Sequence, residues 1–367
     1  MVKISWAQAL AWRLGRQMLD PIGTEPVEGV VRRLVAIQSG ESFTTELAVR
    51  TRRERSEAGE VAEALLDGRL IRTFAFRGAT HLMTPEEGGI YLALRASSRM
   101  WELPSWQTYY RLAPADWPSL REVVQAALAS GPLTVNELVA SIAAPQPFRH
   151  LGPILAGNPW SVLKALAWHG DICFGSMQGR QATLQRLDTN PRWAGVPDVE
   201  EAGPRAVEAY LAAYGPATPA HLNYWLGSGL GAGKHVRAWI AGLADRLVEV
   251  DLEGTAAMAL RDDVENLEAM PASAAVRLLP ANDQWALGPG TADVHVVPPA
   301  RRAAISRGAN MVVVGGVVCG TWSVRDGVVA VDWFAESGPA PTGPIDDEVA
   351  RLGAILGRPL AASVQTA

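Results

Sequence analysis

Lysine is nearly absent from this sequence of 367 residues, which contains only Lys3, Lys164 and Lys234. Arginine therefore carries almost all of the positive charge, and its planar guanidinium suits paired hydrogen bonds to phosphates and base edges. A GC-rich genome that favours Arg, Ala, Gly and Pro codons explains the same bias, and we give that explanation more weight. The formal net charge of −5 argues against a protein that coats nucleic acid without specificity.

Cysteine is equally scarce, since Cys173 and Cys319 are the only two and lie in separate apolar segments. This favours buried free thiols over a disulfide, and because the histidines show no ligand spacing we expect no metal. No apolar run is long enough to span a membrane, and residues 1–17 lack the apolar core and cleavage site of a signal peptide. With 48% hydrophobic and 19% charged residues, we expect a well-packed cytoplasmic protein.

The N-terminal part of the chain has the pattern of three helices followed by a hairpin. Apolar residues recur at helical spacing over residues 6–19, 27–35 and 57–66. Residues 70–83 then alternate apolar and polar side chains around Arg77-Gly78, which predicts a β-hairpin. This order of elements is that of a winged helix-turn-helix.

The same order returns in the middle of the chain. Thr134 and Glu137 have the spacing of a capping box, which predicts the start of a helix. Another helix is expected over residues 161–169, and a second hairpin is expected to turn at Gln178-Gly179.

A third repetition begins at Thr218, which we expect to cap a helix that has Pro219 at its first position. The next helix is expected over residues 234–244, and a third hairpin turns at Glu253-Gly254. Two Gly-Pro-x-Thr helix starts, each leading to a hairpin, indicate an internal repeat. Winged helices bind nucleic acid or dock other proteins, and the pattern alone favours neither role.

After Ala275 the sequence consists of short β-rich runs with glycine turns, which predicts a small β-barrel or a curled sheet. A last helix is expected over residues 345–356. The predicted fold class is α+β, with three tandem winged helix-turn-helix modules followed by a small C-terminal β-barrel. The expected boundaries are 1–118, 119–195 and 196–272 for the three modules, and 273–367 for the β-barrel with its C-terminal helix.

Several stretches of the chain resemble the bacterial winged-helix DNA glycosylases, the AlkZ- and YcaQ-like family. The matching pieces fall in order along nearly the whole chain and are "LVAIQSGESFTTELAVRTR", "IRTFAFRGATHLM", "LKALAWHGDICFG", "YLAAYGPATPAHLNYWLG", "VRLLPANDQWALG" and "GGVVCGTWSVRDGVVAV". The resemblance implies tandem winged helices and a C-terminal β-barrel that form a C-shaped DNA clamp. It also implies excision of bulky or crosslinked N7-alkylated purines without a metal or organic cofactor. Some relatives protect the producer of a DNA-alkylating antibiotic.

The resemblance also places a catalytic pair at Gln38 and Gly40. In relatives this triplet is Gln-aliphatic-Gln, Gln-aliphatic-Asp or a variant that begins with His, at the end of a helix, and the pair holds the attacking water. Gln38 matches the first position, whereas Gly40 offers no side chain at the second. Either Glu41 takes the vacant place, or Glu46 or His81 supplies the second contact, or the protein binds its target without cleaving it.

From the residues alone, Gln38 is more simply a helix-end amide that caps backbone carbonyls, and Glu41 is an acid beside a helix N-terminus. With the resemblance, both become candidate catalytic residues. No lysine lies near Gln38 in the sequence, which argues against a Schiff-base lyase mechanism.

Two stretches contain candidate DNA contacts. Arg50, Arg52 and Arg53 belong to the basic run "RTRRER", which is either a phosphate-binding face or a solvated helix end. Arg77 and His81 lie in "RGATHL", where the hairpin turn either reaches a phosphate or the minor groove, or satisfies hydrogen bonds within the wing.

A third stretch, "LLPANDQWALG", resembles the family segment that carries a hairpin probing the DNA lesion. Asp283 and Trp285 are its notable residues and are included among the candidate DNA contacts. Trp285 either stacks on an exposed base or a planar drug, or packs in a core, which is the commoner environment of tryptophan.

These patterns support three hypotheses. The first is a monofunctional DNA glycosylase that acts on double-stranded DNA carrying alkyl adducts, for repair or antibiotic self-resistance. We expect this enzyme to be a monomer and to act at the nucleoid. The second is a non-catalytic protein that binds DNA or a DNA-reactive small molecule. The third is the same fold used for small-molecule chemistry. The missing second glutamine keeps the last two hypotheses open.

Overall fold

The computed structural model describes residues 1–227 and 233–367 and contains two compact units. Unit 1 comprises Met1–Glu63, Val207–Trp225 and Arg237–Ala367, and unit 2 comprises Ala64–Ala206 and Leu226–Val236. Unit 1 is therefore assembled from both ends of the chain and a short central segment. Both units combine helices with strands, which confirms the predicted mixed class.

The helices of unit 1 are α1 (Trp6–Arg16), α2 (Val27–Arg33), α3 (Ser42–Arg50), α12 (Pro219–Leu222), α14 (Val264–Glu268), α15 (Gln284–Leu287), α16 (Arg302–Ser306) and α17 (Thr342–Leu356). Its strands are β1 (Val2–Ile4), β2 (Ile37–Gln38), β8 (Leu247–Leu252), β9 (Thr255–Leu260), β10 (Val276–Leu279), β11 (Asn310–Val314), β12 (Val317–Arg325), β13 (Val328–Trp333) and β14 (Ala361–Thr366).

Unit 2 contains the helices α5 (Pro85–Ala96), α6 (Pro104–Tyr110), α7 (Trp117–Ala127), α8 (Val135–Ala143), α9 (Leu151–Gly157) and α10 (Trp160–Trp168). Its strands are β3 (Ile71–Phe74), β4 (Thr80–Met83), β5 (Leu133–Thr134), β6 (Ile172–Phe174) and β7 (Thr183–Arg186). Three further helices contain a boundary between the units and are α4 (Glu60–Leu66), α11 (Val199–Tyr214) and α13 (Gly233–Ala241).

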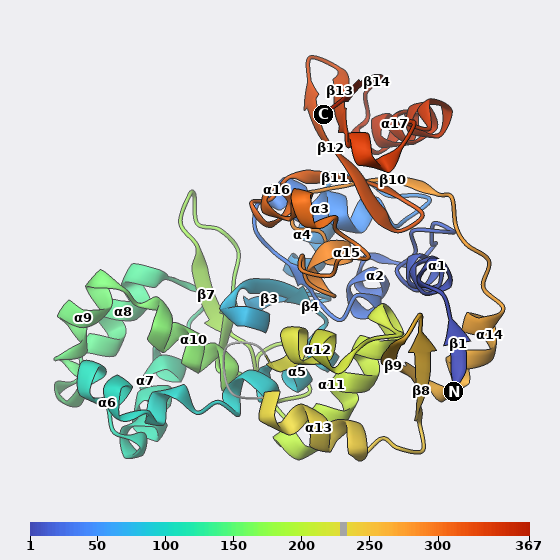
Figure 1. The fold of residues 1–367 in the computed structure, drawn as a ribbon. Helices are drawn as coiled ribbons and strands as arrows, with labels where there is room; N and C mark the ends of the chain where they lie inside the picture. The colour runs from blue at the N-terminus through green and yellow to red at the C-terminus, as the bar shows by residue number, and fades with distance from the viewer. Residues whose placement is uncertain (228–232) are drawn as a thin grey trace. The chain divides into compact units, whose positions relative to one another are not determined.

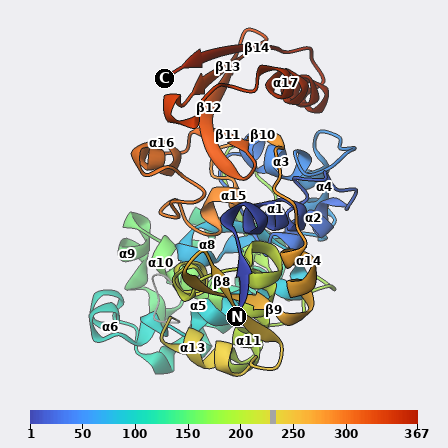
Figure 2. The same cartoon turned by 45° about the vertical axis from the view of Figure 1, so that its right-hand side comes forward.

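The C-terminal strands of unit 1 form a five-stranded sheet in the order β10-β11-β12-β13-β14. Consecutive strands pair antiparallel as far as β13, whereas β14 runs parallel to β13. A parallel neighbour requires a crossover, which α17 supplies while packing against β10 and β14 (Figures 1 and 2). This crossover leaves β10 and β14 at opposite edges. The sheet is therefore open in the described part of the chain, and of the two predicted forms the small β-barrel is wrong.

All three predicted hairpins are confirmed, because β3 pairs antiparallel with β4, β6 with β7 and β8 with β9. Glycines with positive φ close the turns: Gly78 (73°), Gly179 (62°) and Gly254 (89°). Two features were not predicted. In unit 2, β3 pairs with β6, so that the first two hairpins share one sheet. In unit 1, β1 extends the third hairpin by pairing in parallel with β8.

The predicted helix starts at Thr134 and Thr218 are also confirmed. Thr134 forms a capping box with Glu137, and Thr218 forms one with His221 after placing Pro219 at the first helical position. These caps depend on residues only three positions apart, which is why the sequence reveals them.

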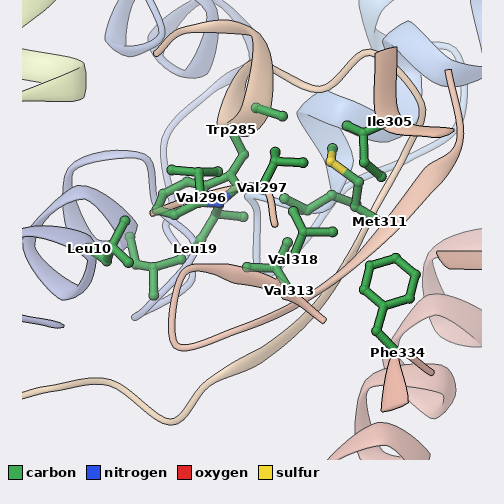
Figure 3. Packing of buried hydrophobic residues seen from close by; sticks show 13 residues of the cluster. Leu10, Leu19, Trp285, Val296, Val297, Ile305, Met311, Val313, Val318 and Phe334 are labelled. Atoms are coloured by element: carbon green, nitrogen blue, oxygen red, sulfur yellow. The ribbon is translucent and has the colours of Figure 1, made fainter. Parts of the chain in front are cut away.

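Trp285 lies within a buried hydrophobic cluster of unit 1, where its side chain is close to Leu19, Val296 and Val297 (Figure 3). Its indole Nε1 donates a hydrogen bond of 2.9 Å to the carbonyl oxygen of Gly316. The cluster draws side chains from α1, α15, α16 and the strands β10 to β12. It therefore joins helix α1 of unit 1 to the C-terminal sheet.

A buried ion pair reinforces this connection. Arg52, which follows α3, donates hydrogen bonds of 2.8 and 2.7 Å to the two carboxylate oxygens of Asp283, and both side chains are fully buried. Arg52 also donates to the carbonyl oxygen of Ala48, and Asp283 caps α15 by accepting from the amide of Trp285. The ion pair thus links two helix ends that lie 231 residues apart in the sequence.

Removing one charge of this pair leaves the other buried without a partner. We expect Asp283→Asn to lower the free energy of unfolding by about 3–5 kcal/mol in urea titrations. The exposed control Asp346→Asn should change it by less than about 0.5 kcal/mol. The double variant Arg52→Met, Asp283→Leu should recover most of the loss. Equal stability of Asp283→Asn and Asp346→Asn would contradict a structural role for the pair.

Candidate active site

Gln38 lies in a short extended segment and not at the end of a helix as predicted. Helix α2 ends at Arg33, and Val35 then adopts a left-handed conformation with φ of 69°, which no helix can continue. The chain straightens into β2 at Ile37, whose β-branched side chain favours extended backbone. Apolar periodicity alone did not reveal this break.

The segment before Gln38 is fixed by burial and by one distant hydrogen bond. Leu34, Val35 and Ile37 are each at most 1% exposed. The hydroxyl of Tyr214 donates a hydrogen bond of 2.8 Å to the carbonyl oxygen of Leu34, from helix α11. Gln38 itself is half-buried. The buried residues before Gln38 therefore fix its backbone, whereas Gln38 itself is partly accessible to solvent.

Gly40 is exposed and has no neighbour within 4 Å of the position that a Cβ would occupy. Its φ lies outside the left-handed region, so a larger residue fits without backbone strain. Glu41 follows as the N-cap of α3, and its carbonyl oxygen accepts hydrogen bonds from the hydroxyls of Thr44 and Thr45. The Glu41 residue is exposed and its side chain makes no capping bond.

Glu46, which was expected as an alternative second contact, is half-buried and accepts a hydrogen bond of 2.9 Å from the backbone amide of Gly59. This bond holds the loop that precedes α4. Glu46 thus has a structural partner within unit 1, whereas the carboxylate of Glu41 remains available beside Gln38 in the sequence.

Two of the predicted DNA-contacting arginines lie in the core. Arg50 is buried and donates to the hydroxyl of Ser56 and to the carbonyl oxygen of Ile355 in α17. Arg52 is fully buried in its pair with Asp283. Burial keeps both guanidinium groups from reaching a DNA backbone, so their prediction as DNA contacts is corrected to a scaffold role.

The rest of the basic run faces a cleft of about 560 Å³. Arg53 donates to the carbonyl oxygen of Glu25 and pairs with Glu60. Arg55 is exposed and lines the same cleft, together with Arg351 of α17. The charge of the run is thus divided between Arg50 and Arg52, which are buried in unit 1, and Arg53 and Arg55, which line the cleft together with Glu54 and Glu57.

Asp283 and Trp285 are likewise placed in the core of unit 1, where they are 1% and 0% exposed. The carboxylate of Asp283 accepts hydrogen bonds from Arg52 and from the amide of Trp285, which caps α15. The indole of Trp285 is surrounded by apolar side chains. Neither residue is available for stacking on DNA, and the prediction of a DNA contact is corrected at both positions.

Arg77 and His81 lie in the first hairpin of unit 2. Arg77 is half-buried and occupies the turn with φ of 54°. His81 is fully buried, and its Nδ1 donates to the carbonyl oxygen of Ala79 at 3.0 Å. Burial lowers the pKa of His81 from 6.5 to about 3, and the charges of Arg77 and Arg95 favour the same direction. His81 is therefore neutral at neutral pH, and its burial corrects the prediction that it contacts DNA.

Both cysteines are free, with Cys173 buried and Cys319 half-buried. In the described ranges, no group of three His, Cys, Asp or Glu side chains is arranged to hold a metal ion. The helices in those ranges are all too short or too polar to cross a membrane.

Comparison with known proteins identifies the class of the chain. Residues 31–355 match the family model described as DNA glycosylase AlkZ-like. The chain is 35% identical over 362 residues to an interstrand DNA cross-link repair glycosylase of Streptomyces sahachiroi, covering 97% of this chain and 98% of the relative. The solved structure of Streptomyces sahachiroi DNA glycosylase AlkZ matches with a TM-score of 0.94 and 34% identity, covering 99% of this chain and all of that one.

This chain therefore belongs to the AlkZ-like DNA glycosylase family. Both the family match and the similarity to the solved structure extend over the Gln38 segment, since each covers most of the chain.

The lowered pKa of His81 generates a stability prediction. In the unfolded chain the imidazole binds a proton as pH falls through 6.5, whereas in the folded chain it does so only near 3. The contribution of His81 to the free energy of unfolding is therefore complete above pH 6.5 and is lost as the pH falls from 6.5 toward 3.

We expect His81→Gln to reduce the slope of unfolding free energy against pH between pH 6 and pH 4, by up to about 1.4 kcal/mol per pH unit. Urea unfolding at several pH values measures this slope. The half-buried His150→Gln serves as the matched control. Identical slopes for His81→Gln and the wild type would show that His81 is not buried in its neutral form.

Proposed function

We propose that this chain hydrolyses the N-glycosidic bond of bulky or crosslinked N7-alkylated purines in double-stranded DNA, with Gln38 positioning the water. The observation that carries the proposal is the Gln38 segment, which is fixed by buried neighbours and by the Tyr214 hydrogen bond. The sequence resemblance aligns this segment with the family's catalytic pair. A fixed backbone suits a group that must orient a water molecule.

The chemistry makes modest demands on the protein. An N7-alkylguanine is already cationic and leaves without acid assistance. What remains is to hold a water molecule against the sugar C1′ and to stabilise the positive charge that develops there. The amide oxygen of Gln38 accepts a hydrogen bond from this water. The carboxylate of Glu41 is the nearest candidate in the sequence for the second contact, since Gly40 has no side chain and Glu46 already holds Gly59.

The remaining features of the proposal concern DNA binding. The three segments that lead from helices to a hairpin act as winged-helix modules, with the boundaries 1–118, 119–195 and 196–272, followed by the C-terminal sheet at 273–367. Arg53, Arg55 and Arg77 contact backbone phosphates, because each is at least partly exposed. The protein acts as a monomer in the cytoplasm at the nucleoid. Its target is DNA modified by a reactive small molecule, as in antibiotic self-resistance.

The glycine at position 40 favours one second candidate function. A protein of this fold that lacks half of the catalytic pair binds the adduct, or the reactive compound, without cleaving the glycosidic bond. Tight binding to adducted DNA without base release would support this function over hydrolysis.

The enzyme proposal is tested with duplex DNA that carries an N7-alkylguanine, followed by hot alkali to convert abasic sites into strand breaks. We expect breaks with the wild type and a rate about a hundredfold lower with Gln38→Ala under single-turnover conditions. The exposed Gln365→Ala should retain the wild-type rate. Equal rates for Gln38→Ala and Gln365→Ala would exclude Gln38 from the reaction.

Restoring the second side chain provides an independent test. Because a Cβ at Gly40 meets nothing within 4 Å and the backbone there is unstrained, we expect Gly40→Gln and Gly40→Asp to fold normally. We also expect them to raise the single-turnover excision rate by about tenfold. Gly343→Gln, at a similarly open glycine of α17, is the matched control. A fall in rate for both Gly40 variants would show that Glu41 or another group already occupies this place.

A further inference from the structure

Unit 2 contains a cluster of cations and aromatic rings that the Gln38 site does not use. It comprises Arg72, Phe74, Arg95, Trp160, Lys164 and Phe174, which we call the Lys164 surface. Lys164 is one of only three lysines in the chain, and it lies on α10. Its Nζ lies 5.2 Å from the centre of the Phe74 ring.

Two of the cations converge at the turn of the first hairpin. A Cβ placed on Gly78 would lie 3.6 Å from Lys164 Nζ and 3.9 Å from Arg95 Nη2. Gly78 has positive φ and carries no side chain, so that the two charged groups share the space beside the backbone of the turn. Two cations held this close repel each other, and burial together with the charge of Arg95 lowers the pKa of Lys164.

Aromatic rings form the rest of the surface. Phe74 contacts Phe174 at 5.1 Å and Trp160 at 5.7 Å between ring centroids. Trp160 and Lys164 are four residues apart on α10 and therefore lie on the same face of the helix. Trp160 is 37% exposed, whereas the Phe74 ring beneath it is buried. An exposed indole supported by the buried Phe74 ring offers a stacking platform.

Two cations of this surface are not neutralised by an acidic side chain. Arg72 lies over the Phe174 ring at 5.0 Å, and neither Arg72 nor Lys164 has a carboxylate partner in the described residues. Burial lowers the pKa of Arg72, so holding this charge costs solvation free energy. A bound anion beside Lys164 relieves its repulsion with Arg95.

We propose that the Lys164 surface binds one DNA backbone phosphate through Lys164, beside the buried Arg95, and stacks the adjoining unpaired base on Trp160. The inference rests on the proposed function in taking DNA as the ligand, and it adds a contact outside the Gln38 site. Cations interleaved with aromatic rings bind single-stranded DNA because the cations attract the backbone and the rings stack on any base.

The test is a binding titration of the full chain with a short fluorescein-labelled single strand, repeated at increasing salt. We expect Lys164→Gln to weaken binding and to flatten the plot of log affinity against log salt by about 0.7 for each phosphate that is no longer bound. Lys3→Gln removes the same charge at an exposed position of β1 in unit 1 and should leave the slope unchanged. Equal slopes for the two lysine variants would overturn the phosphate contact.

The stacking half of the proposal is tested with Trp160→Ala, which should weaken single-strand binding about five- to a hundredfold. Trp160→Phe keeps a ring and should retain most of the affinity, and thermal melting verifies that both variants are folded. Unchanged affinity of folded Trp160→Ala would overturn the stacking contact.

The two proposals fail in different ways. If the wild type releases no alkylated base but the lysine variants differ in slope, the glycosylase proposal fails and the Lys164 surface stands. If the wild type excises the base and the slopes are equal, the Lys164 surface is wrong and the glycosylase proposal stands.

Discussion

The buried ion pair between Arg52 and Asp283 is the constraint on which unit 1 depends. It places the residue that follows α3 against the residue that caps α15, with both charges out of water. Because a buried charge is tolerated only with its partner, the N-terminal 63 residues and the C-terminal sheet region must fold together. The cluster around Trp285 fills the space between them (Figure 3).

This scaffold determines what the Gln38 segment can do. The left-handed turn at Val35 and the hydrogen bond from Tyr214 hold the backbone, and α3 begins immediately after Glu41. The backbone before Gln38 is thus rigid, while Gly40 lies open to solvent. In the proposed reaction the Gln38 amide acts without a partner side chain at position 40, because the cationic leaving group needs little assistance.

Sequence reasoning succeeded where the physical signal is local. The caps at Thr134 and Thr218 and the hairpin turns at Gly179 and Gly254 each depend on residues within a few positions of one another. It failed where the partner is distant. A dense run of arginines indicates a charged face, and nothing near Arg52 in the sequence reveals a carboxylate 231 residues away.

The same limit applies to the sheet and to the site. Strand-rich runs indicate a β structure, but the position of β14 depends on the crossover by α17, which local pattern does not specify. For the site, Gln38 was identified through resemblance, whereas its extended backbone depends on the unusual conformation of Val35. The burial that neutralises His81 likewise arises only from tertiary packing.

The most direct test of the account is denaturing gel electrophoresis of a DNA duplex joined by an N7–N7 guanine crosslink. Excision of either crosslinked guanine breaks the only covalent connection between the strands. The account predicts that excess protein converts the crosslinked species into separated strands. Persistence of the crosslinked species, under conditions in which the protein binds that duplex, would contradict it.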